Sequence, residues 1–333
     1  MIKIGVIFGG QSGEYEVSIV SARSVMDALD KKKYKITPIK ISKKGVWVGI
    51  DNPIKFLKKL DIVFPLIHGT TGEDGGLQGF LEFFGIPYVG AGVMDSALGM
   101  DKIVQKRLFQ QENLPVVDFV EMNSCLRRND KGGNRNDKGG DILRRIGFPI
   151  FVKPARGGSS VGISLVKHAK NLDSALKLAK KYDSKVIVEG AVPENREFEC
   201  AVLGNEKPKA SVVGEVLASN EFYDYNAKYI DGKSEIIIPA KIPKQLSAQI
   251  RDMSIQAYKA LDCSGMVRVD FLYDFKAKKL YLNEVNTIPG FTPISMYPKL
   301  WEASGLSYPK LLDELVKLGM KRHKQRQKLL SNL

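Results

Sequence analysis

The sequence predicts a protein of mixed α/β and α+β architecture, with an N-terminal domain built on a parallel, doubly wound sheet and two smaller α+β units after it. Two observations carry this prediction. The chain has 333 residues, which exceeds one ordinary domain of roughly 100–200 residues. At the start of the chain, strand-like runs alternate with helical patterns. Later in the chain, strand-like runs outnumber helical patterns. We expect domains at residues 1–94, 95–184 and 185–320, and a basic tail at residues 321–333.

The N-terminal domain begins with a strand, a turn and a helix. Residues 2–8 are an apolar run, residues 9–13 are rich in glycine, and residues 15–29 carry apolar side chains at helical spacing. This order, continued along the chain, is typical of a parallel sheet covered by helices. The further predicted strands are residues 36–41 and 61–66, and the further predicted helices are residues 74–84 and 95–111.

Two α+β units follow. The central unit has a glycine-serine loop between two strand-like runs, and then a helix whose apolar residues recur at i, i+3, i+4 and i+7. The third unit has four strands and the clearest amphipathic helix of the chain. The predicted strands of both units are residues 148–153, 163–166, 186–189, 197–203, 266–273 and 279–285, and their helices are residues 171–180 and 245–261.

A polar insertion interrupts the central unit at residues 127–145. The hexapeptide Arg-Asn-Asp-Lys-Gly-Gly occurs at residues 128–133 and again at residues 135–140. A polar, glycine-rich segment of this kind is typical of a solvated surface loop, and its repeat is too short for a solenoid unit. We assign it no function.

The composition is that of a soluble globular protein, with 44% hydrophobic and 26% charged residues. No apolar run approaches the roughly 18 residues of a membrane-spanning helix, and the first residues lack a signal-like pattern. Three widely spaced cysteines, Cys125, Cys200 and Cys263, suggest neither a disulfide framework nor a metal-binding pair. These features predict a cytoplasmic protein with reduced thiols and no membrane insertion.

A glycine-serine loop at residues 155–162 is the first motif that carries chemistry. Its small residues would let backbone N–H groups approach phosphate oxygens closely. Lys153 lies on the preceding strand, from which its ammonium group could reach a nucleotide phosphate. The loop is not of the Walker type, because no Gly-Lys-Ser/Thr opens a helix here. A plain β-hairpin turn is the alternative interpretation.

Two neighbouring strands carry the second motif. Alternation along each strand places Arg268 and Asp270 on one face, and Glu284 and Asn286 on one face. Two carboxylates and an amide oxygen are hard donors that suit Mg²⁺ bound jointly with phosphates. Ordinary charge pairing on exposed strand faces is the alternative, but the intervening apolar residues indicate a sheet packed on a core and favour the metal.

The third motif is the segment His-Gly-Thr-Thr-Gly-Glu-Asp-Gly-Gly at residues 68–76, directly after the predicted strand 61–66. Loops at the carboxyl ends of parallel strands commonly bind substrates in such folds. A lone histidine is more often structural, so His68 by itself decides nothing.

The order of these segments resembles the D-alanine–D-alanine ligase family of the ATP-grasp superfamily. The resemblance runs from Gly9 to Met296, nearly the whole chain, and so many motifs in one order are highly specific. The matching segments are residues 9–18, 68–69, 85–90, 100–102, 153–162, 222–229, 283–292 and 295–296.

The resemblance implies an ATP-grasp fold and an ATP-dependent ligase that joins two D-alanines through an acyl phosphate for bacterial peptidoglycan precursor synthesis. It also implies a homodimer. Two Mg²⁺ or Mn²⁺ ions would be held by Asp270, Glu284 and Asn286. The residues expected to contact the nucleotide are Lys102, Lys153 and Lys228 at its phosphates, Gly157, Gly158 and Ser160 over them, and Glu189 and Glu197 at the adenosine.

For the amino acids, the resemblance implies that Glu14 takes the ammonium of the first D-alanine, with His68 nearby. Arg268 and the backbone near Gly290 would stabilise the oxyanion. The remaining expected roles are Ser159 and Tyr229 linked to Glu14 by hydrogen bonds, and Ser295, Met296 and Tyr223 around the second substrate. Residues 218–234 would form a lid that excludes water.

Two alternative functions and one structural detail stay open beside this interpretation. Related ligases accept D-lactate or D-serine as the second substrate, although residues 228–229 and 295–296 follow the dipeptide-forming pattern. The insertion, and a longer turn between Gly190 and Glu197, could shift details of the adenine contacts. A nucleic-acid role would use the basic tail, because residues 127–145 contribute four and residues 321–328 five of the net +14 charges. We expect no nucleic-acid partner, since no groove-reading module is recognisable.

Overall fold

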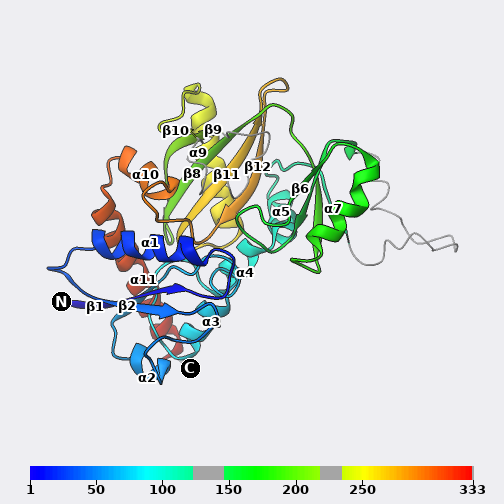
Figure 1. The fold of residues 1–333 in the computed structure, drawn as a ribbon. Helices are drawn as coiled ribbons and strands as arrows, with labels where there is room; N and C mark the ends of the chain where they lie inside the picture. Colours follow the sequence, from blue (N-terminus) through cyan, green and yellow to red (C-terminus); the bar gives the residue numbers. More distant parts are fainter. Residues whose placement is uncertain (123–145, 218–234, 332–333) are drawn as a thin grey trace.

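The computed structural model describes residues 1–122, 146–217 and 235–331. Three sheets organise these residues, and we call them the N-terminal, central and C-terminal sheets (Figure 1). The insertion at residues 127–145 and the expected lid at residues 218–234 both lie wholly outside the described residues.

The N-terminal sheet is parallel, as the sequence predicts, with strand order β2-β1-β3. Its strands are β1 (Ile2–Gly9), β2 (Tyr34–Ile41) and β3 (Ile62–Pro65), and its helices are α1 (Tyr15–Ala28), α2 (Pro53–Leu57) and α3 (Gly76–Phe83). β1 is central and almost fully buried. The loops that follow β1 and β3 therefore leave the sheet side by side, because both strands end at the same edge.

The predicted helix at residues 95–111 is wrong as a single element. The structure has two helices there, α4 (Val93–Met100) and α5 (Lys102–Gln111), separated by Asp101 in an extended conformation. The Asp101 carboxylate accepts hydrogen bonds from the backbone N–H groups of Ile103 and Val104 at 3.1 Å. This is an N-cap, which starts α5 in a new direction.

The central sheet is antiparallel, with strand order β4-β7-β5-β6, and α7 (Leu172–Ala179) packs against β5 and β6. Its strands are β4 (Phe119–Met122), β5 (Ile150–Pro154), β6 (Ser164–Val166) and β7 (Val186–Gly190). β5 and β6 flank the glycine-serine loop, as predicted, whereas β4 was not predicted. The assignment of the strand at residues 186–189 to the third unit is wrong, because β7 pairs with β4 and β5 inside the central sheet.

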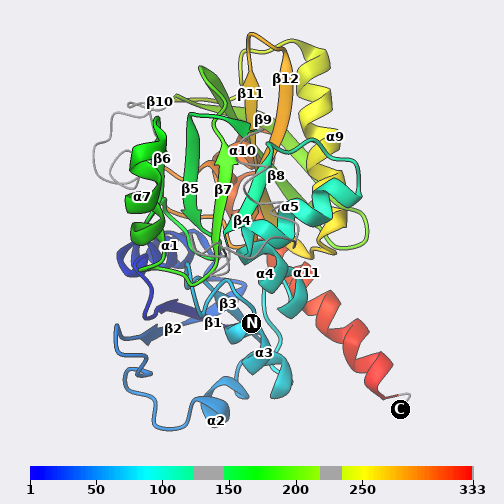
Figure 2. The same cartoon turned by 90° about the vertical axis from the view of Figure 1, so that its right-hand side faces the viewer.

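The C-terminal sheet has the order β10-β9-β8-β11-β12. The predicted amphipathic helix, α9 (Lys244–Ala260), covers it through one continuous apolar cluster. Its strands are β8 (Asn195–Gly204), β9 (Lys209–Leu217), β10 (Glu235–Ile237), β11 (Gly265–Asp274) and β12 (Lys279–Asn286). The sequence analysis did not predict β9 or β10. Figure 2 shows the two antiparallel sheets together above the N-terminal sheet.

Two helices close the chain, α10 (Met296–Ala303) and α11 (Tyr308–Leu330). Both contribute to the core that joins the N-terminal and C-terminal sheets. The basic segment expected as a tail begins inside α11 without a break. Arg322 stacks 4.4 Å from the Tyr88 ring centre and donates a 2.6 Å hydrogen bond to Ser264. Within the described residues, no helix has both the length and the apolar character needed to cross a membrane.

Candidate active site

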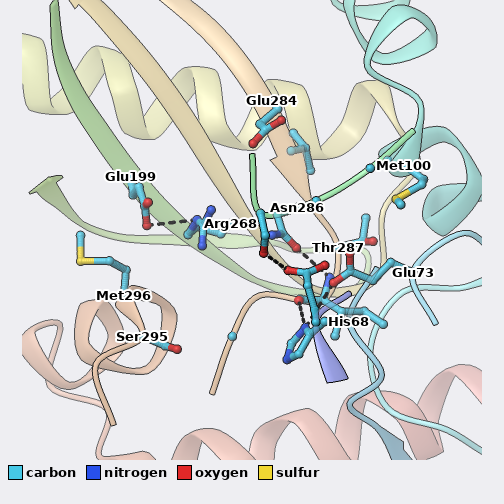
Figure 3. Close-up of a pocket in the computed structure, with 18 of the residues that line it drawn as sticks. His68, Glu73, Met100, Glu199, Arg268, Glu284, Asn286, Thr287, Ser295 and Met296 are labelled. Carbon is cyan, nitrogen blue, oxygen red and sulfur yellow. Dashed lines mark hydrogen bonds and ion pairs between the residues drawn. The ribbon is translucent and has the colours of Figure 1, made fainter. Parts of the chain in front are cut away.

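A cavity of about 280 Å³ lies where the three sheets meet (Figure 3). Segments far apart in the sequence supply its walls: the loops after β1 and β3, the glycine-serine loop, the α4–α5 junction, strands of the C-terminal sheet and the segment before α10. Its polar and small lining residues are Glu14, His68, Glu73, Gly99, Lys102, Gly157, Gly158, Ser159, Glu199, Arg268, Glu284, Asn286, Thr287, Gly290, Ser295 and Lys299.

Glu14 contacts the glycine-serine loop directly. The Ser159 hydroxyl donates a hydrogen bond to Oε1 of Glu14. A Cβ atom on Gly158 would stand only 2.6 Å from Oε2 of Glu14, so a larger residue here would displace this carboxylate or the loop. Ser159 and Ser160 both adopt left-handed backbone conformations, with φ of 50° and 60°. The loop is therefore bent sharply over the carboxylate.

His68 is buried and held from both ring nitrogens. Its Nε2 lies 3.1 Å from the Ser21 hydroxyl, and its Nδ1 lies 3.3 Å from Oε1 of Glu73 and 3.1 Å from the Ile288 carbonyl. Burial disfavours the charged imidazole, but the hydrogen bond and charge of Glu73 outweigh burial and raise the pKa of His68. The ring is thus fixed in orientation against the segment after β12.

Lys102 joins the loop to the C-terminal sheet. Its ammonium donates a 2.7 Å hydrogen bond to the Gly157 carbonyl and lies 3.7 Å from Oε2 of Glu284. Lys102 is the first residue of α5, so the cap at Asp101 sets where its side chain begins. This places a positive charge between the glycine-serine loop and a carboxylate of β12.

Arg268 on β11 is held by two carboxylates. Its Nε and Nη2 donate 2.7 Å hydrogen bonds to the two oxygens of Asp270, and its Nε lies 3.0 Å from Oε2 of Glu199 on β8. Figure 3 shows Glu199 and Arg268 pointing toward each other across the strands. A guanidinium whose orientation is fixed by two carboxylates is a preorganised donor for a negative charge in the cavity.

The acidic pair predicted to hold metal is brought together by strand register. Asp270 stands opposite Glu284, and Arg268 stands opposite Asn286, in the β11–β12 ladder. Two opposed carboxylates and an amide two residues further on form the oxygen donor set that Mg²⁺ prefers, so these residues fit the ion. In the described part of the chain, no group of three His, Cys, Asp or Glu side chains could hold a metal alone. A metal here would also need the Asn286 amide and oxygens from a ligand.

Lys153 and Glu189 form an ion pair between neighbouring strands of the central sheet. The Lys153 ammonium donates a 2.6 Å hydrogen bond to Oε2 of Glu189. Burial would raise the pKa of Glu189, but the nearby lysines lower it to about 2. Glu197 lies on β8, directly opposite Leu272 of β11. None of these three residues lines the cavity itself.

The segment before α10 closes the opposite side of the cavity. The Ser295 hydroxyl accepts a 3.0 Å hydrogen bond from the Thr292 backbone N–H. A Cβ atom on Gly290 would stand 2.6 Å from that same hydroxyl, so the backbone turn here is tight. Met296 begins α10 and presents an apolar wall beside Ser295 (Figure 3).

The structure collects most of the site residues predicted from the sequence. Lys153, Ser160, Glu189, Glu197 and Asp270 do not line the cavity, although Asp270 binds Arg268, which does. Tyr223, Lys228 and Tyr229 lie outside the described residues. The predicted residues that line the cavity are Glu14, His68, Lys102, Gly157, Gly158, Ser159, Arg268, Glu284, Asn286, Gly290, Ser295 and Met296.

Sequence reasoning missed Glu73, Glu199 and Lys106. Glu73 lies in the predicted substrate loop, five residues after His68. Glu199 follows Glu197 by two positions on a predicted strand, so alternation already placed both on one face. Lys106 follows Lys102 by four positions on a predicted helix, which is the spacing of one helical face.

Two antiparallel sheets beside a parallel domain, with a glycine-serine loop and acidic strands facing a shared cavity, define an ATP-grasp ligase. Family models support this class over nearly the whole chain. The model for the D-ala D-ala ligase N-terminus matches residues 3–56 and 49–91, and the model for its C-terminus matches residues 108–317. The chain belongs to the D-alanine–D-alanine ligase family, whose members are carbon–nitrogen ligases.

Individual relatives are similar to this chain over nearly their full length. The D-alanine–D-alanine ligase of Thermoanaerobacter sp. strain X514 is 48% identical, with 97% of this chain and 98% of the relative covered. The structure of the Coxiella burnetii D-alanine–D-alanine ligase has a TM-score of 0.84 at 37% identity, covering 99% of this chain and 97% of that one.

Two further structures bear on the ligands. The Bacillus anthracis D-alanine–D-alanine ligase complexed with ATP has a TM-score of 0.80 at 30% identity, covering 98% of this chain and all of that one. The VanG D-Ala:D-Ser ligase of Enterococcus faecalis has a TM-score of 0.82 at 36% identity, covering 96% and 99%. Both neighbours share this fold while differing in their named second substrate.

Proposed function

We propose that this protein uses ATP to join two D-alanines into D-alanyl-D-alanine, in the cytoplasm, for bacterial peptidoglycan precursor synthesis. The observation that carries the proposal is the cavity itself, which is lined by an anionic residue, Glu14, a cationic residue, Arg268, and the glycine-serine loop. A substrate that binds as an ammonium carboxylate and is converted into an acyl phosphate intermediate needs both signs of charge.

The first D-alanine binds through its ammonium to Glu14. Ser159 donates to the same carboxylate, so the substrate would lie against the glycine-serine loop where a γ-phosphate would sit. His68 is held rigid beside this position and shapes the pocket through Glu73 and Ser21. The carboxylate of the substrate then points toward the cationic part of the cavity.

The nucleotide lies between the central and C-terminal sheets in this proposal. Lys102, Lys153 and Lys228 contact its phosphates, Gly157, Gly158 and Ser160 cover them, and Glu189 and Glu197 bind its adenosine. Asp270, Glu284 and Asn286 hold two Mg²⁺ or Mn²⁺ ions, which offset the repulsion between the anionic phosphates and the substrate carboxylate. The lysines share this task, because phosphoryl transfer depends on positioning and charge neutralisation more than on covalent help.

The reaction proceeds in two chemical steps. The γ-phosphoryl group passes to the carboxylate of the first D-alanine, which gives an acyl phosphate and ADP. The amine of the second D-alanine attacks the acyl carbon, and inorganic phosphate leaves as the peptide bond forms. Arg268 and the backbone N–H near Gly290 donate to the oxyanion of the tetrahedral intermediate. Ser295, Met296 and Tyr223 position the second substrate, while Tyr229 and the lid exclude water.

The second substrate is the point at which a rival proposal remains, because a D-Ala:D-Ser ligase shares the fold. Purified protein should be incubated with ATP, Mg²⁺ and D-alanine, alone or with D-serine or D-lactate, and the products identified by mass spectrometry. We expect ADP, phosphate and D-alanyl-D-alanine in equal amounts from D-alanine alone. No dipeptide from D-alanine, but turnover when D-serine or D-lactate is added, would replace this proposal with the rival one.

Oligomeric state and metal dependence complete the proposal. We expect a homodimer, which sedimentation velocity would detect as twice the chain mass of 37.0 kDa. Activity should disappear on chelation and return with Mg²⁺ or Mn²⁺. A monomer with full activity would remove the dimer from the proposal without affecting the reaction.

A further inference from the structure

A second lysine lies behind the Lys153–Glu189 pair and has no place in the function proposed above. Lys106 on α5 places its ammonium 3.4 Å from Oε1 of Glu189, while Lys153 contacts Oε2 of the same carboxylate. The side chains of Lys106 and Glu189 are only 1% and 2% exposed. One buried carboxylate is therefore shared between two ammonium groups.

Lys106 also ties this group to the C-terminal sheet. Its ammonium donates a 3.1 Å hydrogen bond to the backbone carbonyl of Asn283, the residue before Glu284 on β12. Lys106 thus contacts the central sheet and the C-terminal sheet at the same time from α5. Burial disfavours the charged form of such a lysine and lowers the pKa of Lys106. The charge of Glu189 opposes that effect.

The two lysines differ in their freedom to leave Glu189. Lys153 stands on β5, just before the glycine-serine loop that would cover phosphates, and its side chain is 12% exposed. Lys106 has both its contacts inside the protein. If Lys153 turns to a phosphate, it gives up its bond to Glu189, and a buried carboxylate without a partner is strongly unfavourable. Lys106 remains in place to balance that carboxylate.

We propose that Lys106 is a positioning residue for nucleotide binding: it is the permanent counterion of Glu189, which frees Lys153 to exchange Glu189 for a nucleotide phosphate. The inference rests on the proposed function, since it assumes that Lys153 contacts ATP. Without Lys106, Glu189 holds Lys153 more tightly, and each nucleotide must break that pair without compensation.

A double-mutant cycle on nucleotide affinity tests the inference. The variants are Lys106→Met, Glu189→Gln and the double variant, and the Kd for ATP with Mg²⁺ is measured by calorimetry in the absence of D-alanine. We expect Lys106→Met to raise this Kd about tenfold or more, because the broken pair is buried. Glu189→Gln also removes the carboxylate assigned to the adenosine, so the cycle compares only the effect of Lys106→Met in the two backgrounds. In the Glu189→Gln background no buried carboxylate retains Lys153, so Lys106→Met should alter Kd less than about threefold.

A matched control comes from the same helix. Arg107→Met removes a positive charge next to Lys106, but the Arg107 side chain is mostly exposed and pairs with Glu121. This variant should bind ATP like the wild-type protein. Lys106→Arg keeps the charge and should recover most of the affinity that Lys106→Met loses.

The outcomes separate the inference from a purely structural role. Equal effects of Lys106→Met in both backgrounds, or wild-type affinity in the Lys106→Met protein, would overturn it. If Lys106→Met does not fold, Lys106→Gln, which removes the charge but keeps a polar group, takes its place in the cycle: the inference requires a larger effect on Kd in the wild-type than in the Glu189→Gln background, and equal effects overturn it. Wild-type protein that binds no ATP would overturn the proposed function and this inference together, whereas binding with additive effects overturns this inference alone.

Discussion

Ser159 donates a hydrogen bond to Glu14 although 145 positions separate them in the chain. The two residues come from different parts of the fold. Glu14 lies just before α1, which follows β1 of the N-terminal sheet, and Ser159 lies in the loop between β5 and β6 of the central sheet. Their contact closes one side of the cavity. It also links the proposed site for the first D-alanine to the loop that would cover the phosphates.

Removing the Ser159 hydroxyl should weaken handling of the first substrate. Ser159→Ala deletes a donor to a partly buried carboxylate, and hydrogen bonds to charged groups contribute about 1.5–3 kcal/mol. We expect kcat/KM for D-alanine to fall roughly ten- to a hundredfold, measured with a coupled ADP assay. Ser174→Ala, at an exposed serine of α7, serves as the control. Unchanged kinetics in Ser159→Ala would mean that the contact has no part in catalysis.

Gly158 tests the same contact by steric means. A methyl group at this position would meet Oε2 of Glu14 at 2.6 Å, closer than real Cβ contacts allow. Gly158→Ala should therefore push the loop away from Glu14 and lower activity at least as much as Ser159→Ala. Gly79→Ala in α3 is the control, since nothing lies within 4 Å of a Cβ added at that position. Equal activity of the two glycine variants would contradict the closed arrangement.

Glu284 should control the phosphoryl-transfer step. It faces Asp270 in the ladder, lines the cavity and lies 3.7 Å from Lys102. Glu284→Ala should reduce ADP formation about a hundredfold or more, because metal ions contribute several kcal/mol of charge stabilisation. Glu112→Ala changes an exposed carboxylate and should have no effect. ADP formation near the wild-type rate in Glu284→Ala would refute the metal assignment.

Glu199 should act through Arg268. Its carboxylate lies 3.0 Å from Nε of Arg268, which Asp270 also binds. Glu199→Gln removes one of the two charges that orient the guanidinium, so we expect kcat to fall about tenfold while KM for ATP changes little. Steady-state kinetics with each substrate varied in turn would separate the two parameters. A rise in KM for ATP with kcat intact would place the role of Glu199 elsewhere.

Asp183 should govern part of the acid stability of the fold. It accepts hydrogen bonds from the backbone and side chain of Arg156 and from the Lys185 backbone N–H. Burial alone would raise the pKa of Asp183, but these hydrogen bonds outweigh burial and hold it below its ordinary value of 3.8. A depressed carboxyl pKa contributes stability that is complete above the ordinary value and is lost as the pH falls through the folded-state value.

The corresponding measurement is urea denaturation of Asp183→Asn at about pH 7 and about pH 3.5. We expect the variant to be about 1–3 kcal/mol less stable at neutral pH, and the difference to shrink in acid. Asp252→Asn, at an exposed position of α9, should match the wild-type protein at both values. A stability difference between the variant and the wild-type protein that grows in acid would contradict the predicted direction.

The sequence by itself determined the local chemistry of this protein. Alternation along two strands places Arg268 with Asp270 and Glu284 with Asn286, because side chains on a strand point to opposite faces in turn. The glycine-serine loop, the parallel N-terminal sheet and the amphipathic helix α9 were likewise predictable, since each depends on residues close together in the chain. The order of such motifs was enough to indicate the family.

Only the tertiary structure decided which charges meet. The break at Asp101 escaped prediction because the apolar pattern continues across it, while the cap depends on how α5 must be directed. Glu199 and Lys106 gain their partners from strand register and helix packing, which no local pattern specifies. Burial then gives these charges their importance, because an ion pair removed from water depends on every partner that the fold supplies.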